Sequence, residues 1–436
     1  MTRFSLRDSR SLNFGISAQR KAYLPERSDA IFIWLTLIGI FFPPFLVSVG
    51  GINIWPGRFT AILLLVPALG VLFGKGRRRV ASDLFIVLLG IWILTASSFN
   101  GGFRPYVGAE ALELLGAYFA GRAFFFGRTN LQTFVRALER IAFVLIAFAV
   151  IDILSGRYLI LDIFGVENIT ATRFGIIRAS SVFETAEHYG TFCAVAASVF
   201  LYSERGPRRI WYVSLAFFGC ALSLSSGPIM GLGIVVATFG YNLLLKRYEW
   251  RWKALVAGLA TFTALIFATH DRPIEWIIVH ATLDPATGFF RINTWNQALP
   301  LIDGSKLIGR GLTDLTLGSA EAQIYLRSVD CVWLVEALRY GLPAVAFLFL
   351  AMFWPFSTRR ILNDSLVYTC GTGLSVAVIT MGIIGLTVHY WDATWLLLYL
   401  CIGIRASVSE YEISARRLGG YQMSSNVLPV AATAMR

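Results

Sequence analysis

Hydrophobic residues lie along the chain in long, nearly uninterrupted runs that are separated by short polar segments. A helix of about 20 apolar residues is long enough to cross the hydrocarbon core of a bilayer. It also satisfies its own backbone hydrogen bonds, which lipid cannot do. The pattern therefore predicts an all-α polytopic membrane protein with about twelve transmembrane helices, at approximately 30–48, 58–74, 82–98, 108–126, 138–155, 188–203, 210–225, 228–245, 254–269, 332–354, 363–386 and 388–405.

Basic residues are concentrated in every second connection between these runs. The basic clusters are at 75–79, 122–140, 205–209, 246–253 and 359–360, whereas the short connections on the opposite side contribute only Arg104. Because arginine and lysine are retained on the cytoplasmic side, this bias predicts that both termini are cytoplasmic. The expected organisation is a cytoplasmic segment at 1–29, a transmembrane domain at 30–405 with large outer loops at about 156–187 and 270–331, and a polar, loosely ordered cytoplasmic tail at 406–436.

Composition agrees with this class of protein. Apolar residues make up 56% of the chain and charged residues 15%, which is too little charge to cover a soluble domain of this length. A formal net charge of +12 would suit a nucleic-acid partner, but the orientation bias already accounts for most of the basic residues, so none is expected. The five cysteines show no CxxC pair and no metal-binding spacing, so they are interpreted as small packing residues. No cofactor is expected.

The two outer loops are too long to be simple connections. The second contains two segments with helical periodicity, Glu275–Leu283 and Phe290–Leu299. Both loops also carry basic residues that the orientation bias does not explain: Arg157, Arg173, Arg178, Arg272, Arg291, Lys306, Arg310 and Arg327. These residues either pair with nearby carboxylates on a solvated surface or hold an anionic head group at the membrane edge. The planar guanidinium fork is well suited to phosphate.

Arg178 opens a polar segment that enters the sixth predicted span and ends at Gly190. This segment places Glu187 and His188 at the membrane boundary. A histidine beside a glutamate suits a general base, although an interfacial histidine that caps a helix is the simpler interpretation.

Arg291, Arg310 and Asp330 are further candidates in the second outer loop. Arg310 lies between Gly309 and Gly311, which allows either a close backbone approach to a ligand or a simple turn. Asp330 precedes the tenth predicted span, where it fits a catalytic base and equally fits a helix N-cap. Four other carboxylates are interpreted as polar contacts that hold the bundle together: Glu110, Glu113, Asp152 and Asp392.

The order of these features resembles the bacterial O-antigen ligase and polymerase superfamily, particularly its exopolysaccharide polymerase branch. The resemblance covers about residues 110–355. It rests on four features in this order: the Arg178-Ala-Ser-Ser-Val-Phe segment, the Leu222-Ser-Leu-Ser-Ser-Gly-Pro turn, Arg291 with Trp295 followed by Gly309 and Gly311, and Ser328-Val-Asp-Cys with the Leu338-Arg-Tyr-Gly-Leu run.

Members of this family transfer a glycan from a polyprenyl-pyrophosphate carrier to a hydroxyl acceptor outside the cytoplasmic membrane. The resemblance implies a GT-C-like fold in the bacterial inner membrane and an inverting, metal-independent glycosyltransferase that polymerises repeat units. It implies that Arg178 and Arg291 bind the pyrophosphate; Arg310 and His188 are further substrate-binding candidates, and Asp330, then Glu187, are the candidate bases. The expected partners are the polyprenyl-pyrophosphate-linked oligosaccharide, membrane lipid, a chain-length regulator and a flippase.

The chain departs from the family pattern at two positions. Ligases carry a histidine eleven residues before the glycine matched by Gly341, and this chain has Asp330 there, which favours a polymerase. The family often has Ser-Arg-Gly where this chain has Ser225-Ser226-Gly227, so one expected cation is missing. Two alternatives remain open: a ligase that transfers finished polymer to lipid A core or protein, and a twelve-span exporter or flippase. An exporter would need essential charges near the bilayer midplane, where this chain has few.

Overall fold

The computed structural model describes residues 28–49, 52–74, 76–102, 104–166, 168, 171–281, 285–311, 329–354 and 365–427. These residues form sixteen helices and two short antiparallel hairpins, which confirms the all-α class. The helices are α1 (Ala30–Ile40), α2 (Pro56–Leu72), α3 (Ala81–Phe99), α4 (Pro105–Phe124), α5 (Arg128–Ser155), α6 (Leu159–Ile163), α7 (Ala186–Ser203), α8 (Gly206–Leu222), α9 (Ser226–Leu244), α10 (Arg251–Thr269), α11 (Pro273–Ala281), α12 (Pro285–Asp303), α14 (Val332–Tyr340), α15 (Leu342–Phe353), α16 (Ser365–Ile384) and α17 (Asp392–Val427). The strands are β1 (Val47–Val49), β2 (Ile52–Ile54), β3 (Thr172–Arg173) and β4 (Ile176–Ile177).

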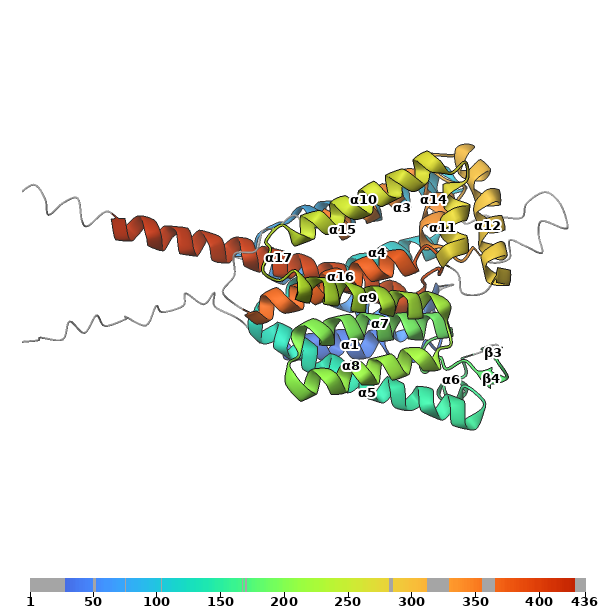
Figure 1. The fold of residues 1–436 in the computed structure, drawn as a ribbon, viewed down its shortest axis with the longest axis horizontal. Coiled ribbons are helices and arrows are strands. Elements are labelled where there is room, and N and C mark those ends of the chain that lie inside the picture. Colours follow the sequence, from blue (N-terminus) through green and yellow to red (C-terminus); the bar gives the residue numbers. More distant parts are fainter. Residues whose placement is uncertain are drawn as a thin grey trace, which may run out of the picture.

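The long helices run side by side as a bundle with two distinct ends (Figure 1). At one end lie α6, the β3–β4 hairpin, α11 and α12, and we call this the hairpin end. From the other end, here called the tail end, the last turns of α17 project beyond the bundle. Helices α11 and α12 overlap the two helical segments that the sequence predicts in the second outer loop.

Several helices have the character of membrane spans. Helices α3, α9, α10, α16 and α17 are long and apolar enough to cross a membrane, and α1, α2 and α15 are apolar but shorter. Large apolar side chains on α10 face outward, including Val256 and Leu259, which are 67% and 58% exposed. A helix so apolar and so little covered by protein suits a lipid environment. The chain therefore has the features of a helical membrane protein, and each predicted span overlaps a helix.

Two predicted spans are interrupted. The first helix ends at Ile40, and the chain then passes through Pro43 and Pro44 into the β1–β2 hairpin. Proline lacks the N–H that a helix needs, so the span at 30–48 does not continue as a helix. The predicted span at 332–354 is divided into α14 and α15 by Gly341, whose φ of +82° is a conformation that favours glycine.

The tail prediction is wrong for residues 406–427, because α17 continues to Val427. A buried ion network accounts for the first part of this extension, around Glu410. Glu410 forms ion pairs with Arg122 and with Arg77, the latter at 2.9 Å, and it accepts the Arg78 backbone N–H at 2.6 Å. Arg122 also pairs with Asp83 at 3.0 Å. These contacts hold α17 around Glu410 against α4 and the start of α3. The segment at 1–27 lies outside the described residues.

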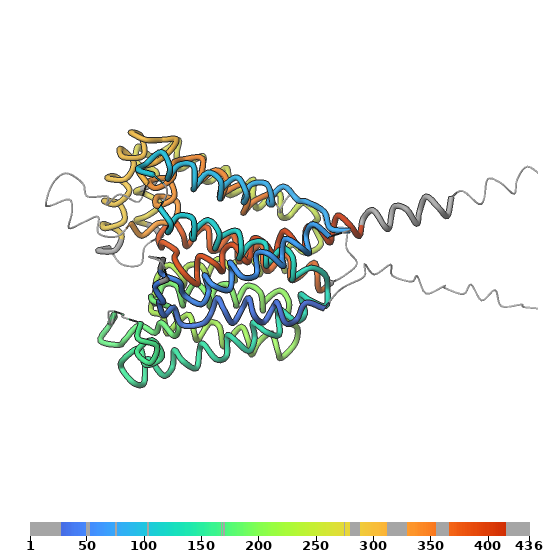
Figure 2. Tube along the Cα trace, turned by 180° about the vertical axis from the view of Figure 1, so that it is seen from behind, coloured from blue at the N-terminus to red at the C-terminus, as the bar shows by residue number. Residues whose placement is uncertain are grey.

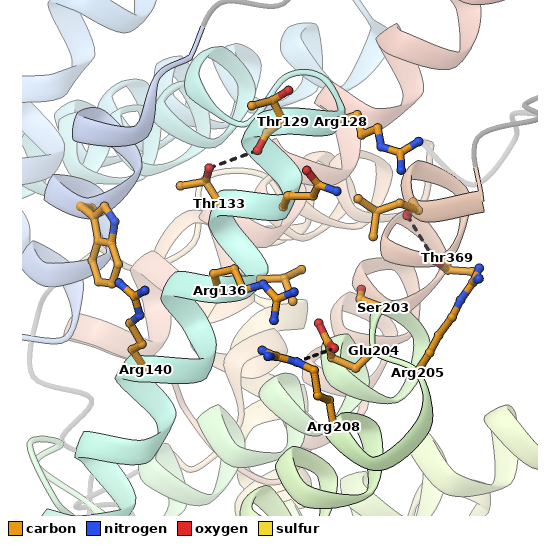
Figure 3. A pocket seen from close by; sticks show the side chains of 14 residues that line it. Arg128, Thr129, Thr133, Arg136, Arg140, Ser203, Glu204, Arg205, Arg208 and Thr369 are labelled. Carbon is orange, nitrogen blue, oxygen red and sulfur yellow. Dashed lines mark hydrogen bonds and ion pairs between the residues drawn. The ribbon is translucent and has the colours of Figure 1, made fainter.

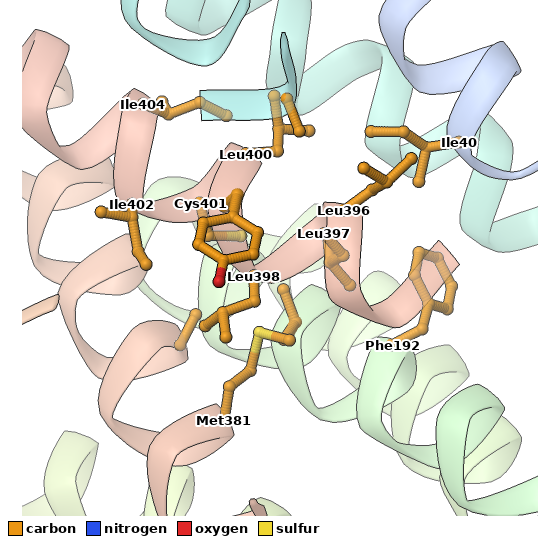
Figure 4. Close-up of a cluster of buried hydrophobic side chains, with 14 of the residues drawn as sticks. Ile40, Phe192, Met381, Leu396, Leu397, Leu398, Leu400, Cys401, Ile402 and Ile404 are labelled. Atoms are coloured by element: carbon orange, nitrogen blue, oxygen red, sulfur yellow. The ribbon is translucent and has the colours of Figure 1, made fainter. Parts of the chain in front are cut away.

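The core is an apolar cluster around α17. Leu396 and Leu400 of α17 lie among Ile40, Phe192 and Met381, which come from three other helices (Figure 4). Seen from behind, α17 lies alongside the first helices of the chain (Figure 2). The part of α17 between Asp392 and Ala415 is therefore packed inside the bundle rather than on its surface.

Close packing between α4 and α17 should make Gly403 intolerant of a larger side chain. A Cβ there would lie 2.2 Å from the carbonyl oxygen of Tyr118, so the two backbones would have to separate. We expect Gly403→Ala to cost about 1–3 kcal/mol of stability, measured as a lower thermal midpoint in detergent. Gly233→Ala is the control, because a Cβ at position 233 would meet no atom within 4 Å. Equal midpoints for the two variants would contradict the close packing.

Candidate functional site

Buried contacts hold the segment that begins at Arg178 in one conformation. Asp152 on α5 is fully buried and accepts the backbone N–H groups of Ser180 and Ser181 at 3.2 and 2.8 Å. Ser181 adopts a φ of +57°, a conformation that L-residues rarely take without such support. The Tyr158 hydroxyl donates to the Arg178 carbonyl at 3.0 Å. Together these bonds fix how Arg178 leaves β4 and approaches α7.

Arg178 and Glu187, both predicted site residues, form an ion pair at the hairpin end. Nη2 of Arg178 donates to Oε1 of Glu187 at 2.5 Å, and Nε donates to the Ser223 carbonyl at 3.2 Å. The two charged side chains are 17% and 32% exposed, so the pair remains accessible. An ion pair favours the charged carboxylate and weakens it as a proton acceptor. Glu187 is therefore better placed to orient Arg178 than to act as a base.

Arg291 reaches the same site from α12. Its Nη2 donates to the Thr387 carbonyl at 3.3 Å. Burial lowers the pKa of the Arg291 guanidinium, and the nearby carboxylates of Asp330 and Glu187 oppose that shift. Arginine remains charged under these conditions because its ordinary pKa is so high. The structure thus brings together four predicted site residues: Arg178, Glu187, Arg291 and Asp330.

A third arginine of the site, Arg173, was predicted only as one of the unexplained outer cations. Its Nη1 donates to the Leu224 carbonyl at 2.8 Å, and it interacts electrostatically with Arg291. Leu224 lies in the α8–α9 turn, next to the Ser225-Ser226-Gly227 sequence that lacks the expected arginine. A cation from β3 is therefore present at this turn. Strands β3 and β4 are only two residues long each, so their sequence pattern is too weak to predict where Arg173 lies.

The loop between α16 and α17 forms another wall of the site. The predicted spans at 363–386 and 388–405 leave one residue between them, whereas the structure has a loop at 385–391. Its Thr387 carbonyl accepts the bond from Arg291. Burial lowers the pKa of His389 to about 3, so this imidazole is neutral at physiological pH. Nδ1 of His389 is buried and has no hydrogen-bond partner among the described residues.

His188 lies behind this loop and is only 2% exposed. Its Nε2 donates to the His389 carbonyl at 2.9 Å, and its ring packs edge-on against Trp391 with the centroids 4.2 Å apart. The cap of α7 is Thr185, whose hydroxyl accepts the His188 backbone N–H. The side chain therefore supports the loop. The His188 side chain does not cap the helix. It is also buried away from the surface where the substrate was predicted to bind.

Arg310 lies in a tight turn that packs against the end of α14. Its backbone N–H donates to the Leu338 carbonyl at 2.7 Å. Gly309 and Gly311 have φ values of +65° and +71°, and a Cβ on Gly309 would lie 2.6 Å from the backbone of Arg339. The sequence left two explanations for these glycines, a close approach to a ligand or a simple turn. The structure supports a turn, which packs closely on protein backbone.

Asp330 does not occupy the N-cap position. Helix α14 begins at Val332 with Cys331 as its N-cap, and no side chain caps it. Asp330 is half-buried and lies within electrostatic range of Arg291. The alternative interpretation as a helix cap is therefore not confirmed.

Carboxylates predicted to hold the bundle together have partners on other elements. Glu113 pairs with Arg58 at 2.5 Å, and Glu110 accepts the Tyr340 hydroxyl bond at 2.7 Å. Asp152 accepts the two backbone bonds described above. These contacts use the carboxylates for structure, since a buried charge without a partner is costly.

The hairpin end therefore presents three arginines with a half-buried aspartate beside them. Guanidinium groups form strong, paired hydrogen bonds to phosphate oxygens, and a nearby carboxylate can accept a proton. This arrangement suits a phosphate ester that reacts at the edge of a helical bundle. Comparison of the chain with protein-family models and with curated proteins finds no match.

Proposed function

We propose that this protein is a membrane-embedded polymerase of lipid-linked oligosaccharide repeat units. It transfers a glycan from a polyprenyl-pyrophosphate carrier to a sugar hydroxyl on the outer face of the bacterial cytoplasmic membrane, during exopolysaccharide or O-antigen synthesis. The observation that carries this proposal is the convergence of Arg173, Arg178 and Arg291 beside Asp330 at the hairpin end. The family resemblance in the sequence points to three of these residues, Arg178, Arg291 and Asp330.

The proposal includes twelve membrane spans, with the hairpin end on the outer, periplasmic face of the cytoplasmic membrane and both termini in the cytoplasm. Five helices meet the length and hydropathy of a span, and the other predicted spans also overlap helices of the bundle. The basic clusters that include Arg77, Arg136 and Arg208 belong to connections and helix ends at the tail end, which supports a cytoplasmic location for that end.

In the proposed reaction the acceptor hydroxyl attacks the anomeric carbon from the face opposite the carrier. The bond between that carbon and the pyrophosphate oxygen breaks, and its electron pair leaves with the pyrophosphate. Arg178 and Arg291 stabilise the charge that develops on this leaving group. Asp330 accepts the proton of the attacking hydroxyl, and Glu187, which pairs with Arg178, orients that arginine. The product has inverted configuration.

The test is Asp330→Asn in cells that lack the native copy of the protein. General-base catalysis typically contributes about 100- to 10,000-fold to a rate, so long polysaccharide should disappear while single repeat units are still transferred. Asp303→Asn is the control, since this carboxylate is 73% exposed and pairs only locally with Lys306 in the described contacts. Polysaccharide length is measured by gel electrophoresis.

The same experiment separates the alternatives. A ligase would leave full-length polymer on the lipid carrier, and an exporter would leave repeat units at the cytoplasmic face. Normal polymer length in an Asp330→Asn protein present in the membrane at wild-type amount would overturn the proposed role of this aspartate.

A further inference from the structure

A cavity of about 750 Å³ is lined by residues near the first turns of α5, α8 and α16 (Figure 3). These turns lie at the tail end, opposite the candidate site (Figure 1). The cavity is bordered by α5, the connection between α7 and α8, and α16. This volume is within the range of small-molecule binding sites. Five of the side chains that line it are arginines: Arg128, Arg136, Arg140, Arg205 and Arg208.

The cavity has more positive than negative charge. Glu204 lines it, and Glu139 lies beside it on α5. Glu139 pairs with Arg208 at 2.6 Å and with Arg136 at 3.3 Å, and Glu204 pairs with Arg208 at 3.3 Å. The cavity region therefore carries five arginines and two carboxylates, and these pairs involve Arg136 and Arg208. The side chains of Arg136 and Arg208 are also 51% and 49% exposed, so their remaining donors can reach a ligand.

The cavity lining also contains apolar surface. The Arg140 guanidinium lies 5.7 Å from the centre of the Trp34 ring, and Val135 and Leu366 contribute aliphatic side chains. Cations beside apolar groups suit an amphiphile with a phosphate head. The orientation bias explains why arginines gather at this end of the bundle. It does not explain why five of them surround one cavity.

We propose that this cavity binds a phosphate group, and that the group belongs to the head of an anionic phospholipid in the cytoplasmic leaflet. Basic pockets between helices on the cytoplasmic side are suited to such head groups. The guanidinium forks supply paired donors to the phosphate oxygens. The site is separate from the proposed transferase site; it rests on the membrane orientation proposed above and not on the transferase activity.

The first test uses the purified full-length protein in neutral detergent. Binding of phosphatidylglycerol, phosphatidylcholine and inorganic phosphate is measured by native mass spectrometry and titration. We expect Arg136→Gln/Arg140→Gln to weaken phosphatidylglycerol binding by about tenfold per arginine. Glu139 keeps its partner Arg208 in this variant, so the fold should be retained. The matched control Arg247→Gln/Lys253→Gln removes the same charge from exposed positions outside the cavity.

A second variant adds charge without removing any described ion pair. Gln132 is an exposed residue of the cavity lining, and Gln132→Glu places a negative charge there, which should also weaken binding. If inorganic phosphate competes with phosphatidylglycerol, and the cavity variants weaken the binding of both, the phosphate site is supported. The phosphate group would then come from a soluble ligand. Unchanged phosphatidylglycerol binding in both cavity variants, or an equal loss in the control, would overturn the proposal.

Discussion

Arg291→Ala should lower the rate of glycan transfer by about 100- to 1000-fold, the scale expected when one preorganised donor to a developing negative charge is removed. The guanidinium is already held in position by the Thr387 carbonyl and balanced by Asp330 and Glu187. Little reorganisation is therefore needed when charge develops on the leaving pyrophosphate. The rate is measured with purified protein and carrier-linked repeat units as kcat and KM.

Two further variants test whether the effect depends on the paired N–H donors of the Arg291 guanidinium group. Arg291→Lys keeps the charge but loses the paired donors, so its rate should lie between those of wild type and alanine. Arg272→Ala removes an arginine that also belongs to the hairpin end but is 75% exposed and paired with Glu275, and it should transfer at nearly the wild-type rate. A higher KM with an unchanged kcat would show that Arg291 binds the substrate equally in the ground state and the transition state. Wild-type kcat and KM in Arg291→Ala would contradict its role.

The helices were predictable because lipid-facing segments leave a strong apolar pattern. The interruptions were not, because they depend on single residues. Gly341 divides α14 from α15 only because the chain takes a positive φ there, and a glycine elsewhere in a helix has no such effect. The extension of α17 depends on Glu410 meeting Arg77 and Arg122, which are distant in sequence. The segment after residue 405 was therefore predicted as loose, although tertiary ion pairs hold its part around Glu410.

The candidate residues could be selected one by one from the sequence, but their arrangement in space could not be predicted. Arg178 and Arg291 stood out because the orientation bias could not explain cations in the outer loops. Their common location depends on the fold of α12 against the loop at 385–391. His188 shows the limit of such reasoning, because its position beside Glu187 suggested chemistry while its ring is buried and supports the loop.

Glu410→Ala should destabilise the protein by about 3–5 kcal/mol, because it removes one partner from a buried ion network. Arg122 is fully buried, and Arg77 donates both Nε and Nη2 to the same carboxylate. Without Glu410 these guanidinium groups would keep their desolvation cost and lose most of the compensating charge. Asp83 would remain as the partner of Arg122, so the loss should stop short of unfolding the bundle.

The measurement is denaturant or thermal unfolding of the purified protein in detergent. Glu410→Gln keeps the shape of the side chain and one acceptor oxygen, so its stability should lie between those of wild type and Glu410→Ala. Glu249→Ala removes an exposed carboxylate near the same end of the bundle and should change stability by less than about 0.5 kcal/mol. If Glu410→Ala unfolds like Glu249→Ala, the ion network does not hold α17 in place. The loss should also exceed that of Gly403→Ala, because an uncompensated buried charge costs more than a local displacement of two helices.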